Sequence, residues 1–485
     1  MPADLDELFG ALGSYTDRVP VGPPELARRR GQRRTRRRLA ASALAVMLVI
    51  GSVVIVATRF QQPDEPPTPA TPAPSSAPVR FTPLQPLGAG VDMALGGYGM
   101  VAVVGDRAYV GAVTVDDRLQ VNAIDLKTGD PLWSSVDLGT FDDWNGLLAG
   151  PEAVVAIGEH NDGTIPDHVL MVLDPDTGAK RWETGFDDLD IEWYDFGAVL
   201  PSRTSVRAVD WRTGAELWRM PVPDTNPQPE FLQNLSTADA TTAPARLRVG
   251  LDPTDHRLFM IEPSGRLHRY DAATGLEQEV VPVAGPTVAP RQGLLVNYRL
   301  VDDQLFSTND DRTEAYRYDL RNPAGLVPVY TATGADRISS VTACGPGRAC
   351  VITSSSAPSD KLNLVDLTSG RTLWQVEIDY ADHVLAAGDW IITGRGNLIE
   401  ATTGQRFNPP SAVLGGWVTP SGALIVTADA EDPVRNPHTV FGVSTLDGSS
   451  VSLGQIGPIA GLCGWSTTVL VCPTAEGFRA WRFAT

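Results

Sequence analysis

The chain has 485 residues, of which 42% are apolar and 20% are charged, a balance that excludes a chain disordered throughout and a membrane protein with many spans. The formal net charge of −19 is unevenly distributed, because residues 1–60 hold 10 basic and 5 acidic residues, whereas the rest holds 29 basic and 53 acidic residues. An acidic body repels phosphate groups, so the composition predicts no nucleic-acid partner.

Turn-forming residues dominate the body of the sequence. The chain contains 39 Pro and 46 Gly between short apolar stretches, which indicates many turns and predicts an all-β fold. Only Lys127, Lys180 and Lys361 are lysines among the 39 basic residues. This bias is typical of GC-rich coding and indicates a high-GC bacterium.

Residues 1–38 are predicted to be an Arg-rich cytoplasmic tail. Leu5, Leu8, Phe9 and Leu12 have the spacing of a short amphipathic helix, which either docks on a partner or frays as a solvated tail. Eight Arg residues follow between positions 28 and 38, immediately before an apolar segment.

Residues 39–58 form an uncharged run of 20 residues, LAASALAVMLVIGSVVIVAT. At ~1.5 Å per residue, a helix of this run is ~30 Å long, which matches the hydrocarbon core of a bilayer. Only Arg59 follows the run directly, so the positive-inside rule predicts a single-pass transmembrane helix with a cytoplasmic N-terminus and an extracytoplasmic body. The alternatives are a buried core helix and a cleaved signal peptide, including a twin-arginine signal at residues 35–39.

Residues 59–86 are predicted to be a Pro-rich extracytoplasmic stalk. Nine prolines lie between positions 61 and 86. Such segments are extended and semi-rigid, at ~3 Å per residue. The stalk is expected to hold the body, residues 87–485, away from the membrane.

A short pattern recurs through the body: Asp, then Thr or Ser three residues later, Gly next, and Trp four residues after the Gly. The four full copies are Asp125, Gly129 and Trp133; Asp174, Gly178 and Trp182; Asp210, Gly214 and Trp218; and Asp366, Gly370 and Trp374. Degenerate copies start at Asp271 and Glu400, and weaker ones at Asp319 and Ser444.

Each copy predicts a β-hairpin. Alternating apolar residues precede the Asp, and a second strand carrying the Trp follows the Gly. The Asp carboxylate can accept hydrogen bonds from amides of the turn, and Gly can take the positive φ that the turn requires. The Trp then projects at a fixed position, where it packs against a neighbouring unit and buries ~150–250 Å². Stacking on a ligand is the alternative role for these rings.

Successive copies from Asp125 to Ser444 are separated by 34 to 61 residues, about the length of one four-stranded propeller blade, ~40–50 residues. With a terminal strand at residues 478–483, nine inner hairpins can be counted, more than the usual limit of ~8 blades. We therefore expect a single β-propeller of eight blades, with seven as the alternative. A strand at residues 79–84 is expected to complete the last blade, since circular closure removes exposed sheet edges.

The repeat resembles the tryptophan-docking repeat of the PQQ-type, or quinoprotein-like, β-propellers, Ala-x-Asp-x-x-Thr-Gly-x-x-x-Trp, and Ala123 and Ala208 match its first position as well. The resemblance covers roughly residues 97–450 and implies a fold rather than a chemistry, because many members bind no quinone. It points to non-catalytic extracytoplasmic members, such as the outer-membrane assembly factor lipoprotein and actinobacterial membrane-anchored relatives. The chain differs from that lipoprotein in its predicted transmembrane anchor and in lacking a lipobox cysteine.

Four cysteines lie in the body, which an oxidising compartment permits to form disulfides. Each close pair brackets one predicted hairpin, so we predict Cys344–Cys350 and Cys463–Cys472, one of three possible connectivities. Neither pair has Cys-x-x-Cys spacing and no His lies within metal-motif spacing, so a metal site is not predicted.

The remaining polar residues form no recognisable catalytic pattern. Six histidines are scattered and are expected at the surface or in turns: His160, His168, His256, His268, His383 and His438. The acidic pairs Asp142-Asp143, Asp187-Asp188 and Asp310-Asp311 lack the alternating ligands of an EF-hand and are expected in solvated loops. No nucleophile elbow, phosphate-binding loop or Ser-x-x-Lys box occurs in its required context. We therefore assign no catalytic, cofactor-binding or metal-ligating residue, and expect no cofactor.

These observations predict a membrane-tethered propeller that binds or scaffolds a protein, peptide or cell-envelope polymer and is not an enzyme. A regulatory variant, in which the cytoplasmic tail reports occupancy inward, belongs to the same class. The alternative is a PQQ-dependent dehydrogenase, which needs a catalytic carboxylate, calcium ligands and a stacking Trp at the propeller centre. A propeller hydrolase or lyase is a third hypothesis.

Overall fold

The computed structural model describes residues 79–485, apart from residues 136–137, 142, 160–167, 187–190, 203, 223–228, 236–252, 263–264, 284–294, 310, 323–324, 356–358, 379–383, 388–389, 394–397, 408–411, 420–421, 429–435 and 445–448. The predicted tail, the apolar run at 39–58 and the predicted stalk up to residue 78 lie outside the described residues. The chain divides into two compact units, Met1–Ser75 and Ser76–Thr485, and the second contains all of the described residues. Within them, no helix has the length and apolarity needed to cross a membrane.

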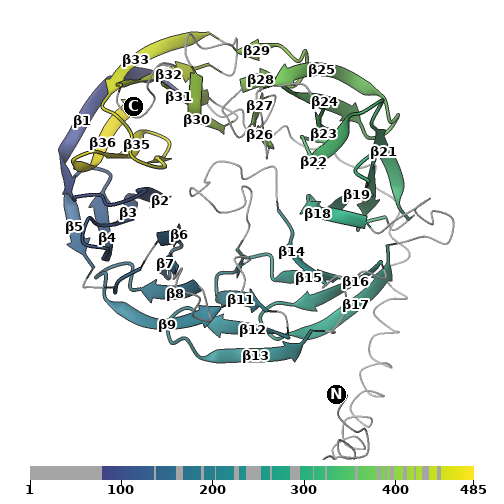
Figure 1. Ribbon diagram of the computed structural model, residues 1–485, viewed down its shortest axis with the longest axis horizontal. Helices are drawn as coiled ribbons and strands as arrows, with labels where there is room; N and C mark the ends of the chain where they lie inside the picture. Colours follow the sequence, from purple (N-terminus) through teal and green to yellow (C-terminus); the bar gives the residue numbers. More distant parts are fainter. Residues whose placement is uncertain are drawn as a thin grey trace, which may run out of the picture. The chain divides into compact units, whose positions relative to one another are not determined.

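The second unit is a single all-β propeller, in which four-stranded antiparallel sheets, here called blades, follow one another around a ring (Figure 1). Blade 1 contains β2 (Met100–Val104), β3 (Arg107–Val113), β4 (Leu119–Asp125) and β5 (Pro131–Ser134); blade 2 contains β6 (Asp143–Ala149), β7 (Val154–Glu159), β8 (His168–Leu173) and β9 (Lys180–Phe186); blade 3 contains β10 (Glu192–Trp193), β11 (Gly197–Pro201), β12 (Ser205–Asp210) and β13 (Glu216–Pro221). Blade 4 contains β14 (Glu230–Gln233), β15 (Arg257–Ile261), β16 (Arg266–Asp271) and β17 (Leu276–Pro282); blade 5 contains β18 (Leu295–Val301), β19 (Gln304–Asn309), β20 (Glu314–Asp319) and β21 (Val327–Thr331); blade 6 contains β22 (Arg337–Ala343), β23 (Arg348–Ser354), β24 (Asp360–Asp366) and β25 (Thr372–Ile378). Blade 7 contains β26 (Val384–Ala387), β27 (Trp390–Thr393), β28 (Leu398–Glu400) and β29 (Arg406–Phe407); blade 8 contains β30 (Ala412–Thr419), β31 (Gly422–Ala428), β32 (His438–Val443) and β33 (Ser450–Ile456); blade 9 contains β34 (Gly464–Trp465), β35 (Val469–Thr474) and β36 (Gly477–Ala484), together with β1 (Phe81–Asp92).

The described residues form nine blades, so the expectation of eight, with seven as the alternative, is wrong. The weak copies of the repeat account for the difference. Asp319 ends β20 and precedes the hairpin to β21, and Ser444 follows β32 before the hairpin to β33. Both segments keep a hairpin although they lack the full pattern, because turn geometry tolerates residue changes that remove the Trp.

The chain closes the ring by pairing its first described strand with its last. β1 is antiparallel to β36, with Phe81 opposite Ala484 and Pro86 opposite Trp481. The expected closure is therefore confirmed. Residues 81–86, which the predicted stalk includes, are part of blade 9, as the strand expected at residues 79–84 implies. Pro is tolerated there because β1 lies at the outer edge of its sheet.

The hydrophobic core lies between neighbouring blades. Strands β3 and β4 are buried along most of their length, whereas the outer strand β5 is largely exposed. One apolar cluster joins blade 1, through Tyr109 and Leu119, to blade 2, through Trp144 and Leu147. Similar clusters join the other neighbours, so each blade is stabilised mainly by the blades beside it.

Both predicted disulfides are present. Cys344 and Cys350 bracket the turn between β22 and β23, and their Cα atoms are 5.5 Å apart. Cys463, just before β34, is bonded to Cys472 on β35, with a Cα separation of 4.2 Å. The local connectivity is therefore confirmed.

Candidate functional site

The Asp of each repeat caps the turn between the third and fourth strands of its blade. Asp210 Oδ1 accepts hydrogen bonds from the Arg212 amide (3.0 Å) and from the amide and hydroxyl of Thr213 (2.8 and 2.7 Å). Burial raises the pKa of Asp210, but the Thr213 hydrogen bonds outweigh it and the net shift is downward. Asp174 and Asp366 accept the equivalent bonds, and Asp125 accepts one from the Lys127 amide.

The Trp of each full repeat contacts the same turn in the next blade. Its indole N–H donates a hydrogen bond to the backbone carbonyl of the residue that directly follows the first residue, Asp or Glu, of the repeat in the next blade. Its ring packs against the Gly of the same turn. The donor and acceptor pairs are Trp133 and Pro175 (3.0 Å), Trp182 and Trp211 (3.0 Å), Trp218 and Ala272 (2.7 Å), and Trp374 and Ala401 (2.9 Å). The glycines beneath the rings are Gly178, Gly214, Gly275 and Gly404.

These rings occupy equivalent positions and are half-buried rather than mostly buried, because each is on the outermost strand of its blade. Gly129 packs against Leu87 of β1 instead of a ring. Gly370 shares the left-handed conformation, with φ of +68°, but has nothing within 4 Å of its Cβ position. We call the contact between two neighbouring blades a joint. Four joints therefore include the Trp contact, whereas the joint between blade 5 and blade 6, which contains Gly370, does not.

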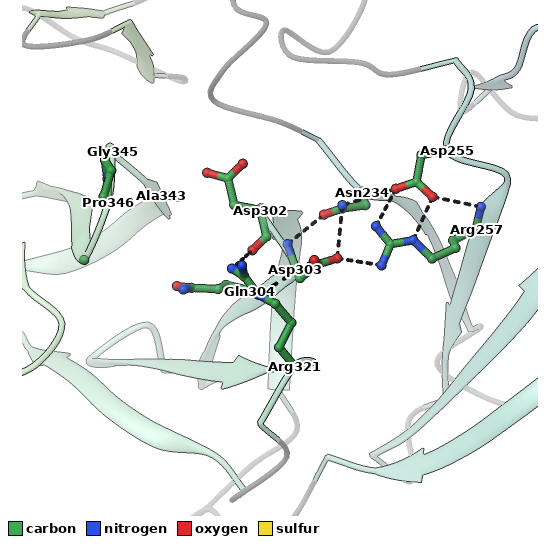
Figure 2. A pocket seen from close by; sticks show the side chains of 11 residues that line it. Asn234, Asp255, Arg257, Asp302, Asp303, Gln304, Arg321, Ala343, Gly345 and Pro346 are labelled. Carbon is green, nitrogen blue, oxygen red and sulfur yellow. Dashed lines mark hydrogen bonds and ion pairs between the residues drawn. The ribbon is translucent and has the colours of Figure 1, made fainter. Parts of the chain in front are cut away.

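A polar pocket of about 540 Å³ lies on the propeller face formed by the turns between first and second strands and between third and fourth strands. It spans blades 4, 5 and 6 (Figure 2). Its lining residues are Asn234, Asp255, Arg257, Asp302, Asp303, Gln304, Arg321, Ala343, Gly345, Pro346 and Gly347. The Cys344–Cys350 bridge closes the turn that contains Gly345 to Gly347, so it constrains the wall from blade 6.

Arg257, the first residue of β15, is held by carboxylates from two blades. Its Nε and Nη2 donate to Asp255 Oδ1 and Oδ2 at 2.7 and 2.6 Å, and its Nη1 donates to Asp303 Oδ1 at 2.6 Å. Asn234 contributes a third link, since its Oδ1 accepts a hydrogen bond from the Asp303 amide at 3.0 Å. The network fixes the guanidinium in the pocket wall and connects blade 4 to blade 5.

Asp302 and Asp303 form the two-residue turn between β18 and β19. Their φ values of 51° and 61° place both in the left-handed region, as two-residue hairpins of type I′ require. This turn directs the Asp302 side chain away from Arg257, whereas Asp303 points toward it (Figure 2). Arg321, which is 63% exposed, donates from Nη2 to the Asp302 carbonyl at 2.7 Å.

The Arg257 and Asp255 pair in the pocket wall is not suited to proton transfer. Burial raises the pKa of Asp255, but the hydrogen bonds and charge of Arg257 outweigh it and hold that pKa below its ordinary value. The Asp255 hydrogen bonds in turn raise the pKa of Arg257. A general acid or base is useful when its pKa lies near the working pH, and this pair is driven away from that range.

The structure places the predicted histidines in several environments. His256 contacts Asp195 at 2.6 Å near the surface. His268 lies between Glu262 and Glu277 and is buried, and His438 on β32 is fully buried, with burial lowering its pKa. The expectation of surface or turn positions is therefore wrong for these two residues, because they lie on β16 and β32, third strands of their blades that are largely buried. His168 packs on Phe186, and His160 and His383 lie outside the described residues.

The described residues contain no cluster of three or more His, Cys, Asp or Glu side chains that could ligate a metal. Of the acidic pairs, only Asp143 and Asp311 lie in the described part of the chain.

Sequence reasoning missed the polar pocket. The one local signal was the Asp302-Asp303 pair between two alternating apolar runs, which has the form of a two-residue hairpin turn. Arg257 and Arg321 carry no such signal, because their partners are distant in sequence.

Residues 202–389 match the family model described as PQQ_2, outer membrane protein assembly factor BamB. The matched segment contains every residue of the polar pocket. The predicted resemblance to PQQ-type propellers is thereby confirmed. No curated protein matches the chain.

Three solved structures are similar to the chain, each with a TM-score of 0.41. BamB from Moraxella catarrhalis is 14% identical, with 82% of this chain and 98% of that chain covered. The computationally designed Ika8 protein is 12% identical, with 83% and 99% covered. A europium-containing methanol dehydrogenase is 13% identical, with 84% and 93% covered.

Proposed function

We propose that this chain is a non-catalytic, membrane-tethered propeller that binds a polypeptide partner outside the cytoplasmic membrane, through the polar pocket of blades 4 to 6. The apolar run at 39–58 and the Arg residues before it support the tether and its orientation. The Pro-rich segment that follows supports a spacer between membrane and propeller.

The observation that carries this proposal is the architecture of the pocket. Three blades contribute to it, and Arg257 is fixed by Asp255 and Asp303 before any partner arrives. Donors and acceptors held in this way bind without a large cost in side-chain entropy. The exposed Arg321 guanidinium and the Asp302 carboxylate complement the amide and charged groups of a polypeptide.

The family model supports a protein as the partner. Its description names an outer membrane protein assembly factor, and its match includes the pocket. A protein in the cell envelope is therefore favoured over a polysaccharide or a small molecule.

Site-specific photo-crosslinking in native cells tests the proposal. The full chain would carry a photo-reactive residue at position 302 in the pocket. The matched control would carry it at position 116, in a second cavity of about 420 Å³ on the opposite propeller face. We expect a discrete polypeptide adduct from position 302 and none from position 116.

Failure to form a polypeptide adduct at position 302 would contradict the proposal, as would equal adducts from both positions. The dehydrogenase alternative predicts a different result. The purified chain, supplied with quinone and calcium, would then reduce a dye when alcohols or aldose sugars are added.

A further inference from the structure

The joint between blades 4 and 5 lacks the Trp contact that its predecessors have. In blades 1, 2, 3 and 6, the Trp lies opposite an apolar residue immediately before a bulge, as in the Ala208 and Trp218 pair. In blade 4 the same register pairs Arg269 with Glu279, again immediately before a bulge. Glu279 therefore stands at the Trp position, four residues after Gly275, and forms an ion pair with Arg269 at 3.2 Å.

A cavity of about 160 Å³ lies at this joint, and we call it the joint cavity. Its lining residues are Arg257, Phe259, Leu267, Arg269, Glu279, Val281, Asp303, Tyr318, Leu320 and Arg321. Leu320 follows Asp319, so it stands at the position whose carbonyl accepts the indole hydrogen bond in the other joints. Both the donor strand and the acceptor turn of a Trp joint are thus present, with a cavity between them.

The joint cavity has an apolar floor and a polar mouth. Phe259, Leu267 and Tyr318 are at most 2% exposed and belong to the core cluster between the two blades. Glu279 and Arg321 at the mouth are 49% and 63% exposed. The floor offers apolar contact, and the mouth is open to a side chain that enters from outside.

Arg269 lines the joint cavity and carries a donor that an entering group could satisfy. Its Nε is buried and has no hydrogen-bond acceptor among the described residues. A buried donor without an acceptor is costly, by about 1–3 kcal/mol. An entering group with a carbonyl oxygen or an aromatic face would satisfy it.

We propose that the joint cavity receives an aromatic side chain of the polypeptide partner. Its volume is close to the ~150 Å³ of cavities that bind a benzene ring, so it accommodates one aromatic ring. In the four Trp joints, an aromatic ring lies between the equivalent outer strand and the equivalent turn of the next blade, so a joint of this geometry accommodates such a ring. The partner would supply the ring that the chain itself supplies elsewhere.

The polar pocket adjoins the joint cavity and completes the binding site. The identity of the ligand as part of a polypeptide rests on the proposed function. Arg257, Asp303 and Arg321 line both cavities. A polypeptide that inserts an aromatic side chain therefore runs its backbone past Arg321 and into the polar pocket, where Arg321 can donate to its carbonyl oxygens. An aromatic residue fixed in a buried pocket is the usual anchor of such interfaces.

Ligand-observed NMR on the full chain in detergent tests the cavity directly. The probe is N-acetyl-tryptophanamide, and the control ligand is N-acetyl-leucinamide. We expect saturation transfer from the protein to the indole protons and little transfer to the leucine amide. The double variant Arg269→Ala and Glu279→Trp copies the Ala208 and Trp218 pair, fills the cavity, and should abolish transfer to the probe.

The matched control is Gln278→Trp, which adds an indole to an exposed position of the same strand outside the cavity and should leave probe binding unchanged. If the double variant does not fold, Glu279→Trp alone fills the cavity from the same position. Thermal melting by circular dichroism establishes that each variant is folded.

Absence of transfer to the probe in the wild type would overturn the inference, as would equal transfer in the filled variant. Crosslinking from position 302 separates this failure from that of the proposed function. An adduct that persists undiminished in the filled variant means that the partner binds without an aromatic anchor, which also refutes the inference and leaves the proposed function intact. Loss of the adduct in the filled variant, with the adduct retained in Gln278→Trp, supports both.

Discussion

Two glycines of the repeat allow the energy of the Trp contact to be separated from the cost of the turn. Gly214 and Gly370 have φ values of +69° and +68°, and each follows an Asp that caps the same turn. The Trp182 ring lies over Gly214, whereas nothing lies within 4 Å of the Cβ position at Gly370. Gly370→Ala is therefore a matched control for Gly214→Ala.

Both substitutions incur the strain of a left-handed Ala, ~1–2 kcal/mol. At Gly214 the new Cβ would also stand 2.7 Å from Trp182 Cδ2, so the ring must move. Overpacking of this kind costs ~1–3 kcal/mol, and loss of the hydrogen bond to the Trp211 carbonyl costs ~0.5–1.5 kcal/mol. We expect a destabilisation of ~2.5–6.5 kcal/mol for Gly214→Ala and ~1–2 kcal/mol for Gly370→Ala.

Urea unfolding of the full chain in mild detergent, followed by far-ultraviolet circular dichroism, measures the difference between the two variants. The Trp182 environment is read separately by near-ultraviolet circular dichroism, which should change in Gly214→Ala and not in Gly370→Ala. Equal destabilisation by the two substitutions would refute the reasoning, because the ring would then contribute nothing measurable at this joint.

Three further predictions follow from the same contacts. A hydrogen bond from Arg181 lowers the pKa of Asp174 to about 2, below its unfolded value of ~3.9, so the stabilisation that the ionised Asp174 provides is fully present above the unfolded pKa and is lost as the pH falls through about 2. Asp174→Asn should therefore lose less stability than the wild type between pH 5 and 2. Urea midpoints that fall in parallel with pH in the two proteins would contradict this. Reduction of Cys344–Cys350 and Cys463–Cys472 should cost ~2–3 kcal/mol per bridge and leave the β signal of circular dichroism, whose complete loss would show the bridges to be essential to the fold. Protease added to intact spheroplasts should digest the propeller and spare an N-terminal tag, because Arg is concentrated before residues 39–58; a protected propeller would reverse the predicted topology.

The blades could be predicted from the sequence because their signal is local. An Asp that accepts hydrogen bonds from its own turn and a Gly with positive φ lie within five residues, and they specify a hairpin without reference to the rest of the ring. The blade number was underestimated because the turns at Asp319 and Ser444 are weak copies that retain the hairpin without the Trp of the repeat, and the copy at Asp319 also lacks the Gly. The repeats of this chain thus retain the hairpin turn more often than the Trp that packs one blade against the next.

The polar pocket could not be predicted, because its contacts are not local. Arg257 and Asp303 are 46 residues apart and meet only when blades 4 and 5 stand side by side. Their approach depends on the angle between neighbouring blades, which no short pattern encodes. The absence of a Trp after Gly275 was visible in the sequence, but its consequence, a cavity at the joint, requires the register of β16 and β17.

The missing Trp and the polar pocket are related features of one joint. The joints from blade 1 to blade 4 are each connected by an indole hydrogen bond, whereas the joint from blade 4 to blade 5 is connected by Arg257 and Asn234 to Asp303. A charged network replaces an aromatic contact where the propeller opens a cavity, so this joint keeps its connection while presenting polar groups and an apolar floor. Arg257→Met would consequently loosen the joint and remove the pocket wall at the same time. Substitutions at Asp302 and Arg321, which lie outside the Arg257 and Asp255 pair, therefore report on binding more directly than any change at Arg257.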